Sequence, residues 1–222
     1  MAKGSSGLSG GSGGTVAVKS VGPIDLSNNP LVYGGDDPGV SGSARAAVVA
    51  WENKRVANKL EYNISVDQDG NPLHKEVRGG KGSVRVPIIG LSEGAIHTHI
   101  HPREDEGVLG GTFSDADLRN FANHDVATYR ARAKEGAYSI SKTGNFDKDG
   151  FNSYVQQSNN KHRAELNTKL QGVAKNYSDK SYTYEQYSKA YNDAFNSFLV
   201  NVHNDLLAGQ KQYGYSYTLE RS

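Results

Sequence analysis

The chain has 222 residues, with 25 lysines and arginines against 24 acidic residues, so its formal net charge is only +1. A near-neutral chain without a block of like charge indicates neither a nucleic-acid nor a membrane-surface partner. Cysteine is absent, which excludes disulfides, thiolate metal ligands and a cysteine nucleophile, so any metal site must use His, Asp or Glu. No apolar run approaches membrane-spanning length and the first residues lack a signal-peptide pattern, so we expect no secretion by that route.

The first part of the chain, residues 1–43, is predicted to be a Gly-Ser-rich arm. Residues 1–14 have the composition of a flexible linker. Residues 15–42 mix short apolar runs with three prolines and several glycines, a pattern typical of an extended segment lying on another surface. We therefore expect this arm to dock on a partner.

The first regular elements are a helix and a hairpin. Ser41 or Ser43 is suited to cap a helix that runs to about Lys59. Residues 60–77, LEYNISVDQDGNPLHKEV, then alternate apolar and polar side chains on both sides of a DQDGN turn. This is the strongest hairpin signal in the chain and predicts two antiparallel strands.

More strands follow around a second helix. Residues 83–89 and 94–100 have strand composition, and Pro102 marks the end of the second of them. Residues 114–135 have the apolar spacing of an amphipathic helix, and residues 137–143 suit a short returning strand. The order of helix, hairpin, strand, helix and strand predicts an α+β sandwich.

The C-terminal part changes character from about Asn159. Residues 161–177 and 184–209 are predicted to be two helices, with Gly209 as the C-cap of the second. Residues 213–220, YGYSYTLE, alternate aromatic and polar side chains as an edge strand does.

These elements divide the chain into three regions. The arm of residues 1–43 precedes a core over residues 44–150, and residues 151–222 form a helical extension with a terminal strand. A chain of this length buries one core with extensions more readily than two independent domains.

The candidate chemical centre lies in residues 95–117. His97, His99 and His101 alternate along a predicted strand, so their side chains leave the same face. A catalytic zinc takes three protein ligands and leaves one position open, and Asp117, at the start of the next helix, is the candidate third ligand. Another interpretation of Ser114 and Asp117 is a helix capping box, and one carboxylate can serve both purposes.

A known family shares this pattern. Residues 97–102, HTHIHP, followed by residues 114–117, SDAD, resemble the HxHP and SxxD signature of the JAB/MPN metalloenzymes, also called JAMM proteases. The resemblance covers roughly residues 44–142 and implies a cytidine-deaminase-like sheet flanked by helices. It also implies a zinc site, but the interval between the two motifs is longer here than is usual in that family.

The resemblance assigns roles to individual residues. It implies that His99, His101 and Asp117 bind zinc. It further implies that Ser114 supports the oxyanion and that Glu61, on an early strand, is the general acid and base.

Two alternatives stay open at this stage. Glu52, in the preceding helix, competes with Glu61 for the catalytic role. The additional His97 leaves open a metal site built from His97 and His99, although Pro102 favours His99 and His101.

A narrower similarity concerns the order of short motifs. The EY strand, the DxDG hairpin, the THxHP strand, the GxFSxxD helix start and the terminal YGYxY resemble the terminal domain of some phage head-morphogenesis proteins of the Mu F type. This implies a phage-encoded protein in the bacterial cytoplasm or the virion, with an arm that contacts head or portal proteins.

The predicted function is therefore a JAMM-like zinc hydrolase of peptide or isopeptide bonds, acting on a protein or peptide substrate. The alternative is a non-catalytic, head-associated virion protein with the same fold. A zinc nuclease or deaminase is disfavoured because the chain lacks the basic groove and the CxxC ligands that such enzymes often use.

Overall fold

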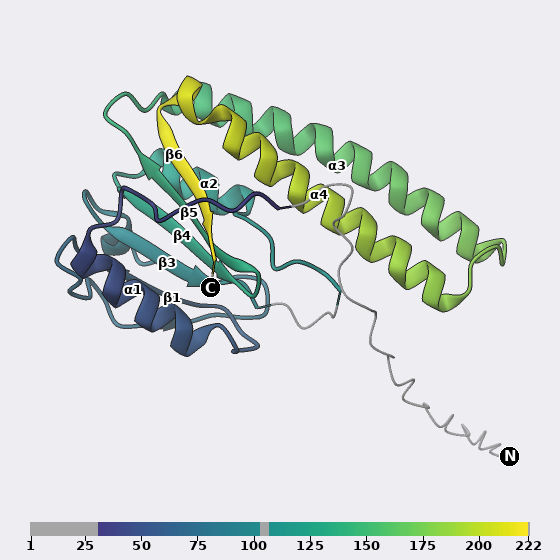
Figure 1. Cartoon of the computed structure of the whole chain (residues 1–222), viewed down its shortest axis with the longest axis horizontal. Helices are drawn as coiled ribbons and strands as arrows, with labels where there is room; N and C mark the ends of the chain where they lie inside the picture. Colours follow the sequence, from purple (N-terminus) through teal and green to yellow (C-terminus); the bar gives the residue numbers. More distant parts are fainter. Residues whose placement is uncertain (1–30, 103–106, 222) are drawn as a thin grey trace, which may run out of the picture.

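A computed structural model describes residues 31–102 and 107–221 and shows an α+β fold with one mixed six-stranded sheet (Figure 1). The strands are β1 (Tyr62–Val66), β2 (Val77–Arg78), β3 (Ile96–Ile100), β4 (Thr128–Ala133), β5 (Gly136–Lys142) and β6 (Tyr215–Glu220). The helices are α1 (Gly42–Arg55), α2 (Asp115–Asn123), α3 (Lys148–Ser178) and α4 (Tyr184–Tyr213), with a short 3-10 helix, η1 (Ile88–Leu91).

The strand order is β2-β1-β3-β4-β5-β6. Only β3 and β4 are parallel, and α2 makes the crossover between them. All the other pairs are antiparallel, including the predicted hairpin of β1 and β2. Because a crossover helix starts where the preceding strand ends, the first turn of α2 lies near the carboxyl end of β3, where the histidines are.

The two faces of the sheet have different covers. On one face α1 packs its apolar side chains, such as Val48, against Ile96. On the other face α2 and α4 build the main core, in which Leu118, Phe121 and Leu206 pack with Tyr129. Helices α3 and α4 form a long antiparallel pair that reaches well beyond the sheet (Figure 1).

Several predicted elements are confirmed. Ser41 occupies the N-cap position of helix α1, but its hydroxyl donates to the carbonyl of Gln68 and makes no capping bond, and the helix ends at Arg55 and not near Lys59. The strands at 94–100 and 137–143 correspond to β3 and β5. The predicted edge strand is β6, which pairs with β5 at one end of the sheet.

The prediction of one helix over residues 114–135 is wrong beyond Asn123. Residues Thr128–Ala133 form the buried central strand β4, which pairs with β3 and β5. The helical spacing of apolar residues continued into this segment, but its side chains point alternately to the two faces of the sheet. Tyr129 lies in the core of one face, and Arg130 bonds Glu52 of α1 on the other. A buried arginine with a distant partner looks like a surface residue when only the sequence is read.

The prediction of a strand over residues 83–89 is also wrong. Pro87 begins the turn into η1, and the segment before it lies beside β1 through a side-chain bond from Asn63 Nδ2 to the carbonyl of Arg85. Proline donates no ladder hydrogen bond, which disfavours a regular strand there.

The C-terminal helices are longer than predicted. Helix α3 begins at Lys148, not near Asn159, because Asp147 caps it by accepting from Gly150 N. Helix α4 continues through Gly209 to Tyr213, and its C-cap is Gly214, whose φ of 68° is left-handed. Gly209 is therefore a packing position and not a cap, and an added Cβ there would lie 2.6 Å from the ring of Tyr154.

The described part of the arm, residues 31–41, lies on the chain's own sheet. Gly34 N donates to the carbonyl of Leu219 in β6, and the Asp37 carboxylate accepts from the hydroxyls of Ser139 and Ser141. The predicted linker of residues 1–14 and the rest of the arm up to residue 30 lie outside the described residues, as do residues 103–106 of the predicted loop. Within the described residues, no helix has the length and apolar character needed to cross a membrane.

Candidate metal centre

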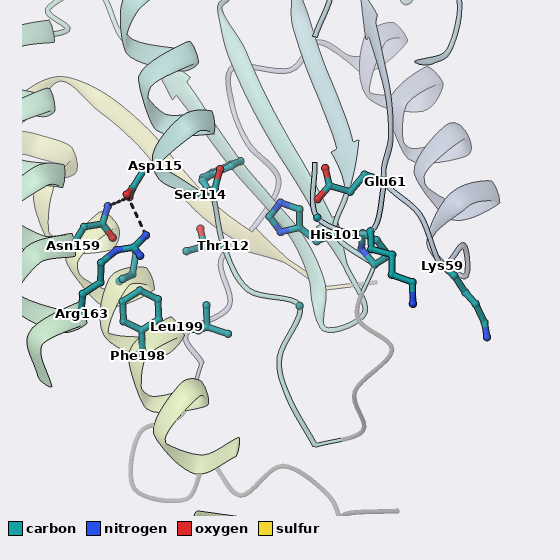
Figure 2. Close-up of a pocket in the computed structure, with 16 residues that line it drawn as sticks. Lys59, Glu61, His101, Thr112, Ser114, Asp115, Asn159, Arg163, Phe198 and Leu199 are labelled. Carbon is teal, nitrogen blue, oxygen red and sulfur yellow. Dashed lines mark hydrogen bonds and ion pairs between the residues drawn. The ribbon is translucent and has the colours of Figure 1, made fainter. Parts of the chain in front are cut away.

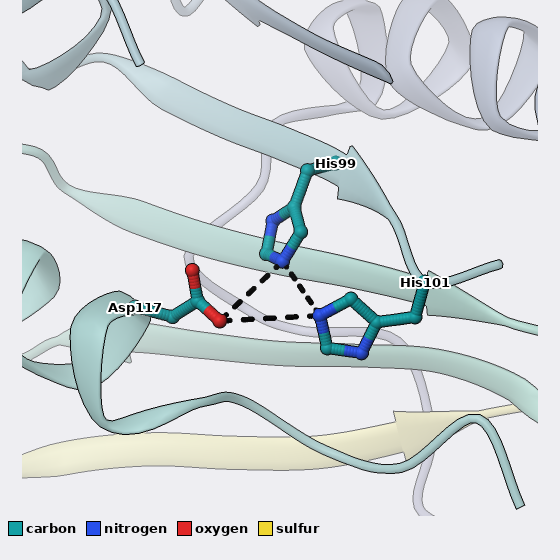
Figure 3. A group of neighbouring side chains, drawn as sticks. All are labelled: His99, His101 and Asp117. Atoms are coloured by element: carbon teal, nitrogen blue, oxygen red, sulfur yellow. Dashed lines mark hydrogen bonds and ion pairs between the residues drawn. The ribbon is translucent and has the colours of Figure 1, made fainter. Parts of the chain in front are cut away.

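Three predicted ligands, His99, His101 and Asp117, meet at the carboxyl end of β3 (Figure 3). The two histidine Nε2 atoms are 2.8 Å apart, and Asp117 Oδ2 lies 3.6 Å from Nε2 of His99 and 3.9 Å from Nε2 of His101. Two imidazole nitrogens and one carboxylate oxygen thus face a common point. This group could hold a metal ion.

Backbone geometry sets the direction of each imidazole. His99 lies in β3 opposite Asn63 and Ala131, and it is almost completely buried. His101 follows the strand, and its backbone N donates to the carbonyl of Arg132. His101 Nδ1 lies 3.1 Å from the carbonyl oxygen of Gly111 and donates a hydrogen bond to it. The other ring nitrogen, Nε2, therefore carries the lone pair that faces the site.

Asp117 forms the predicted capping box and also faces the two histidines. Ser114 and Asp117 form a complete capping box: the Asp117 backbone N donates to Ser114 Oγ, and Ser114 N donates to Asp117 Oδ2. The Ser114 hydroxyl also donates to Asp117 Oδ2 at 2.6 Å. The oxygen held by the cap is the same one that faces the histidines, so the start of α2 orients the third ligand.

The electrostatics of the cluster favour an ionised carboxylate. Burial acts to raise the pKa of Asp117, but His99 and His101 outweigh it and hold that pKa well below its ordinary value. Burial likewise acts to lower the pKa of His99, but the carboxylate of Asp117 raises it above its ordinary value. A negative ligand between two imidazoles is suited to attract a cation.

Glu61 lies beside the cluster, and Glu52 does not. Glu61 comes just before β1 and is half-buried in the wall of the adjoining cleft. Burial raises the pKa of Glu61 to about 7, with His99 lowering it and Asp117 raising it. Glu52 lies on the opposite face of the sheet, where it accepts hydrogen bonds from Thr98 Oγ1 and Arg130 Nε.

His97 is not part of the metal-ligand group. Its Nδ1 lies 2.9 Å from Ser65 Oγ, which in turn lies 3.1 Å from Nε2 of His74. The His97 ring packs on Tyr129 with a 4.4 Å centroid separation, and burial lowers its pKa well below the ordinary value. Among the described residues, the group that could hold a metal ion contains His99 and His101, and His97 packs behind it.

A cleft of about 520 Å³ opens beside this group of His99, His101 and Asp117 (Figure 2). Glu61 and His101 lie on one side of it, and Phe198 of α4 lies on the other. Ser114 and Thr112 lie between these sides (Figure 2). Helices α3 and α4 therefore form one wall of the cleft, a role that the sequence analysis left unassigned.

Glu135, which no sequence motif singled out, organises the loop around His101. Its two carboxylate oxygens accept from Gly110 N at 3.0 Å and Gly111 N at 2.7 Å. The carbonyl of Gly111 is the one that contacts His101, so Glu135 fixes this histidine through the loop. The glycine pair was the available signal, since a Cβ at Gly110 would lie 2.5 Å from that of Ala133.

Comparisons with known proteins add no relative to this picture. No protein-family model matches the chain, and no match was found among curated proteins or solved structures.

Proposed function

We propose that this chain is a zinc-dependent hydrolase of peptide or isopeptide bonds with a JAB/MPN-like fold. The observation that carries the proposal is the convergence of His99, His101 and Asp117 at the edge of a cleft that also contains Glu61. A metal ligand set, a neighbouring carboxylate and space for a substrate are the components that this hydrolysis requires.

The donor set fits zinc. Two imidazole nitrogens and one carboxylate oxygen match the three-ligand pattern of catalytic zinc sites, which keep a further position for water or substrate. Tetrahedral zinc places neighbouring ligand atoms about 3.3 Å apart, and the observed separations of 2.8, 3.6 and 3.9 Å lie on both sides of that value. Zinc bound there would polarise a carbonyl and lower the pKa of a water molecule.

The proposed proton carrier is Glu61. It faces the cleft beside His101, so its carboxylate can take a proton from an attacking water and return it to the departing amine. Its rival, Glu52, is held by Arg130 and Thr98 on the far face of the sheet and has no access to this cleft.

Ser114 contributes first by holding Asp117. Its hydroxyl is exposed at the cleft, but its proton is donated to Asp117 Oδ2. To donate to an oxyanion it must release that bond, so the proposed oxyanion role requires the Ser114 hydroxyl to rotate away from Asp117 Oδ2.

The test combines metal content with turnover. We expect near-stoichiometric zinc in the purified chain and its loss in the double variant His99→Ala, His101→Ala. His124→Ala is the matched control, because this exposed histidine lies at the end of α2, where its Nδ1 bonds the carbonyl of Asn120. Glu61→Gln should keep the zinc and lose cleavage of main-chain peptide and lysine-linked isopeptide libraries.

The results separate two functions. Zinc with Glu61-dependent cleavage supports the hydrolase. The alternative of a structural, head-associated phage protein is supported if nothing is cleaved, with or without zinc, and the histidine variant melts at a lower temperature. Phage origin, a location in the host cytoplasm or the virion, and contacts of the arm with head or portal proteins are proposals that rest on the sequence resemblance.

A further inference from the structure

A buried chain of hydrogen bonds leads from the arm to the cleft. The carbonyl of Val32 lies 3.1 Å from His203 Nε2, and His203 Nδ1 lies 2.8 Å from the hydroxyl of Tyr217. The Tyr217 hydroxyl lies 2.8 Å from Oγ1 of Thr112, which lines the cleft. His203 is fully buried, and Tyr217 and Thr112 are nearly so.

The chemistry of the groups decides the direction of every bond in this chain. A carbonyl only accepts, so His203 Nε2 carries the proton that goes to Val32. Burial lowers the pKa of His203 to about 4, so the ring is neutral near pH 7 and its Nδ1 accepts. The Tyr217 hydroxyl must then donate a hydrogen bond to His203, and the oxygen of Tyr217 accepts a hydrogen bond from the Thr112 hydroxyl.

The hydroxyl of Thr112 therefore donates its hydrogen bond to Tyr217. Its hydroxyl proton points into the protein, and only oxygen lone pairs are left for a ligand in the cleft. Beside it, the α4 wall is apolar: Phe198, Leu199 and Val202 line the cleft, together with Phe113. On the same side the charge of Asp115 is compensated by Arg163 at 3.1 Å and by an amide of Asn159 (Figure 2).

We propose that Thr112 is a specificity-determining residue, which accepts a hydrogen bond from a backbone N–H of a peptide substrate while α4 receives the apolar side chain of that same residue. This inference rests on the proposed function, in which the cleft binds a peptide substrate. It names the substrate class: a peptide with a leucine-like residue beside the bond to be cleaved.

The two parts of the proposal support one another. A hydroxyl that could both donate and accept would bind a carbonyl as well as an N–H, but the chain through Tyr217 removes the first option. A polar substrate side chain would find no partner on Phe198 or Leu199 and would lose its hydration there. The cleft is therefore matched to a donor next to an apolar group.

Peptide binding tests this directly. The probes are three capped dipeptide amides: N-acetyl-alanyl-leucine amide, its analogue with an N-methylated leucine, and the corresponding serine peptide. Each is titrated by NMR into the full chain carrying Glu61→Gln, with and without zinc, so that turnover is not needed. We expect the leucine peptide to bind about three- to tenfold more tightly than the N-methylated one, and about tenfold more tightly than the serine one.

The variants locate the effect. Thr112→Val should abolish the preference for the N–H peptide over the N-methylated one, and Thr112→Ser should keep it. Leu199→Ala should reduce the preference for leucine, whereas Tyr191→Ala, an exposed aromatic of the same helix outside the cleft, should not. Equal binding of the three peptides, no binding, or unchanged discrimination in Thr112→Val would overturn the inference.

These outcomes are distinct from those of the proposed function. Thr112-dependent peptide binding in a chain that takes up no zinc and cleaves nothing would contradict the hydrolase and leave the binding site standing. Zinc uptake with Glu61-dependent cleavage but no role for Thr112 would do the reverse.

Discussion

Both faces of the sheet bury charged groups, but in opposite arrangements. On the α1 face the guanidinium of Arg130 donates to both carboxylate oxygens of Glu52 and to both of Glu220, so each of these buried oxygens has a hydrogen-bond donor. On the other face His99 and Asp117, with His101, aim ligand atoms at one point. Buried charge alone therefore does not mark a functional site. The ground for the proposed metal site is the convergence of ligand atoms beside an open cleft.

Removing Arg130 should have the largest effect. Arg130→Met would leave Glu52 and Glu220 buried without their shared partner, at a cost of about 3–5 kcal/mol in the free energy of unfolding. Urea unfolding followed by Trp51 fluorescence measures this. Arg163→Met, which removes a surface ion pair with Asp115, should cost less than about 1 kcal/mol, and similar losses in the two variants would contradict the comparison.

Acid should weaken the same face. Burial acts to raise the pKa of Glu220, but Arg130 and Arg45 outweigh it and lower the pKa from 4.5 to about 2. A depressed folded-state pKa contributes stability that is complete above pH 4.5 and is lost as pH falls toward 2, on the order of 3 kcal/mol. Unfolding free energies measured across this window should fall more steeply for the wild type than for Glu220→Gln. Parallel curves would refute this assignment.

On the face of the sheet with the candidate metal centre, a substitution should affect zinc binding more than stability. Asp117→Asn keeps the volume of the side chain and removes the charged ligand, so zinc affinity should fall by about 100-fold or more, while stability changes by only about 1 kcal/mol through the altered cap. Competition with a fluorescent chelator measures the affinity. Asp115→Asn, two residues away in the same first turn of α2, is the control and should bind zinc as the wild type does.

A smaller effect is expected at Glu135. Glu135→Gln weakens the hold on Gly110 and Gly111, which position the carbonyl beside His101 Nδ1, so zinc affinity should fall by about tenfold. The same chelator assay applies, with the exposed Glu93→Gln as its control. An unchanged affinity would show that His101 needs no support from this loop.

Much of the geometry of the candidate metal centre could be predicted because its signals are local. Alternation along one strand puts His99 and His97 on the same face, and a capping box places Asp117 in the first turn of a helix. The hairpin and the last strand were also predicted correctly, since turn residues and period-two alternation act over a few positions.

The sequence by itself thus determined the ligand types, their spacing and the elements that present them. Only the tertiary structure decided that residues 128–133 form a central strand, that Glu61 and not Glu52 reaches the cleft, and that α4 supplies its wall. These features depend on partners far away in the chain. Arg130 is a strand residue because Glu52 and Glu220 neutralise it, and no local pattern contains that pairing.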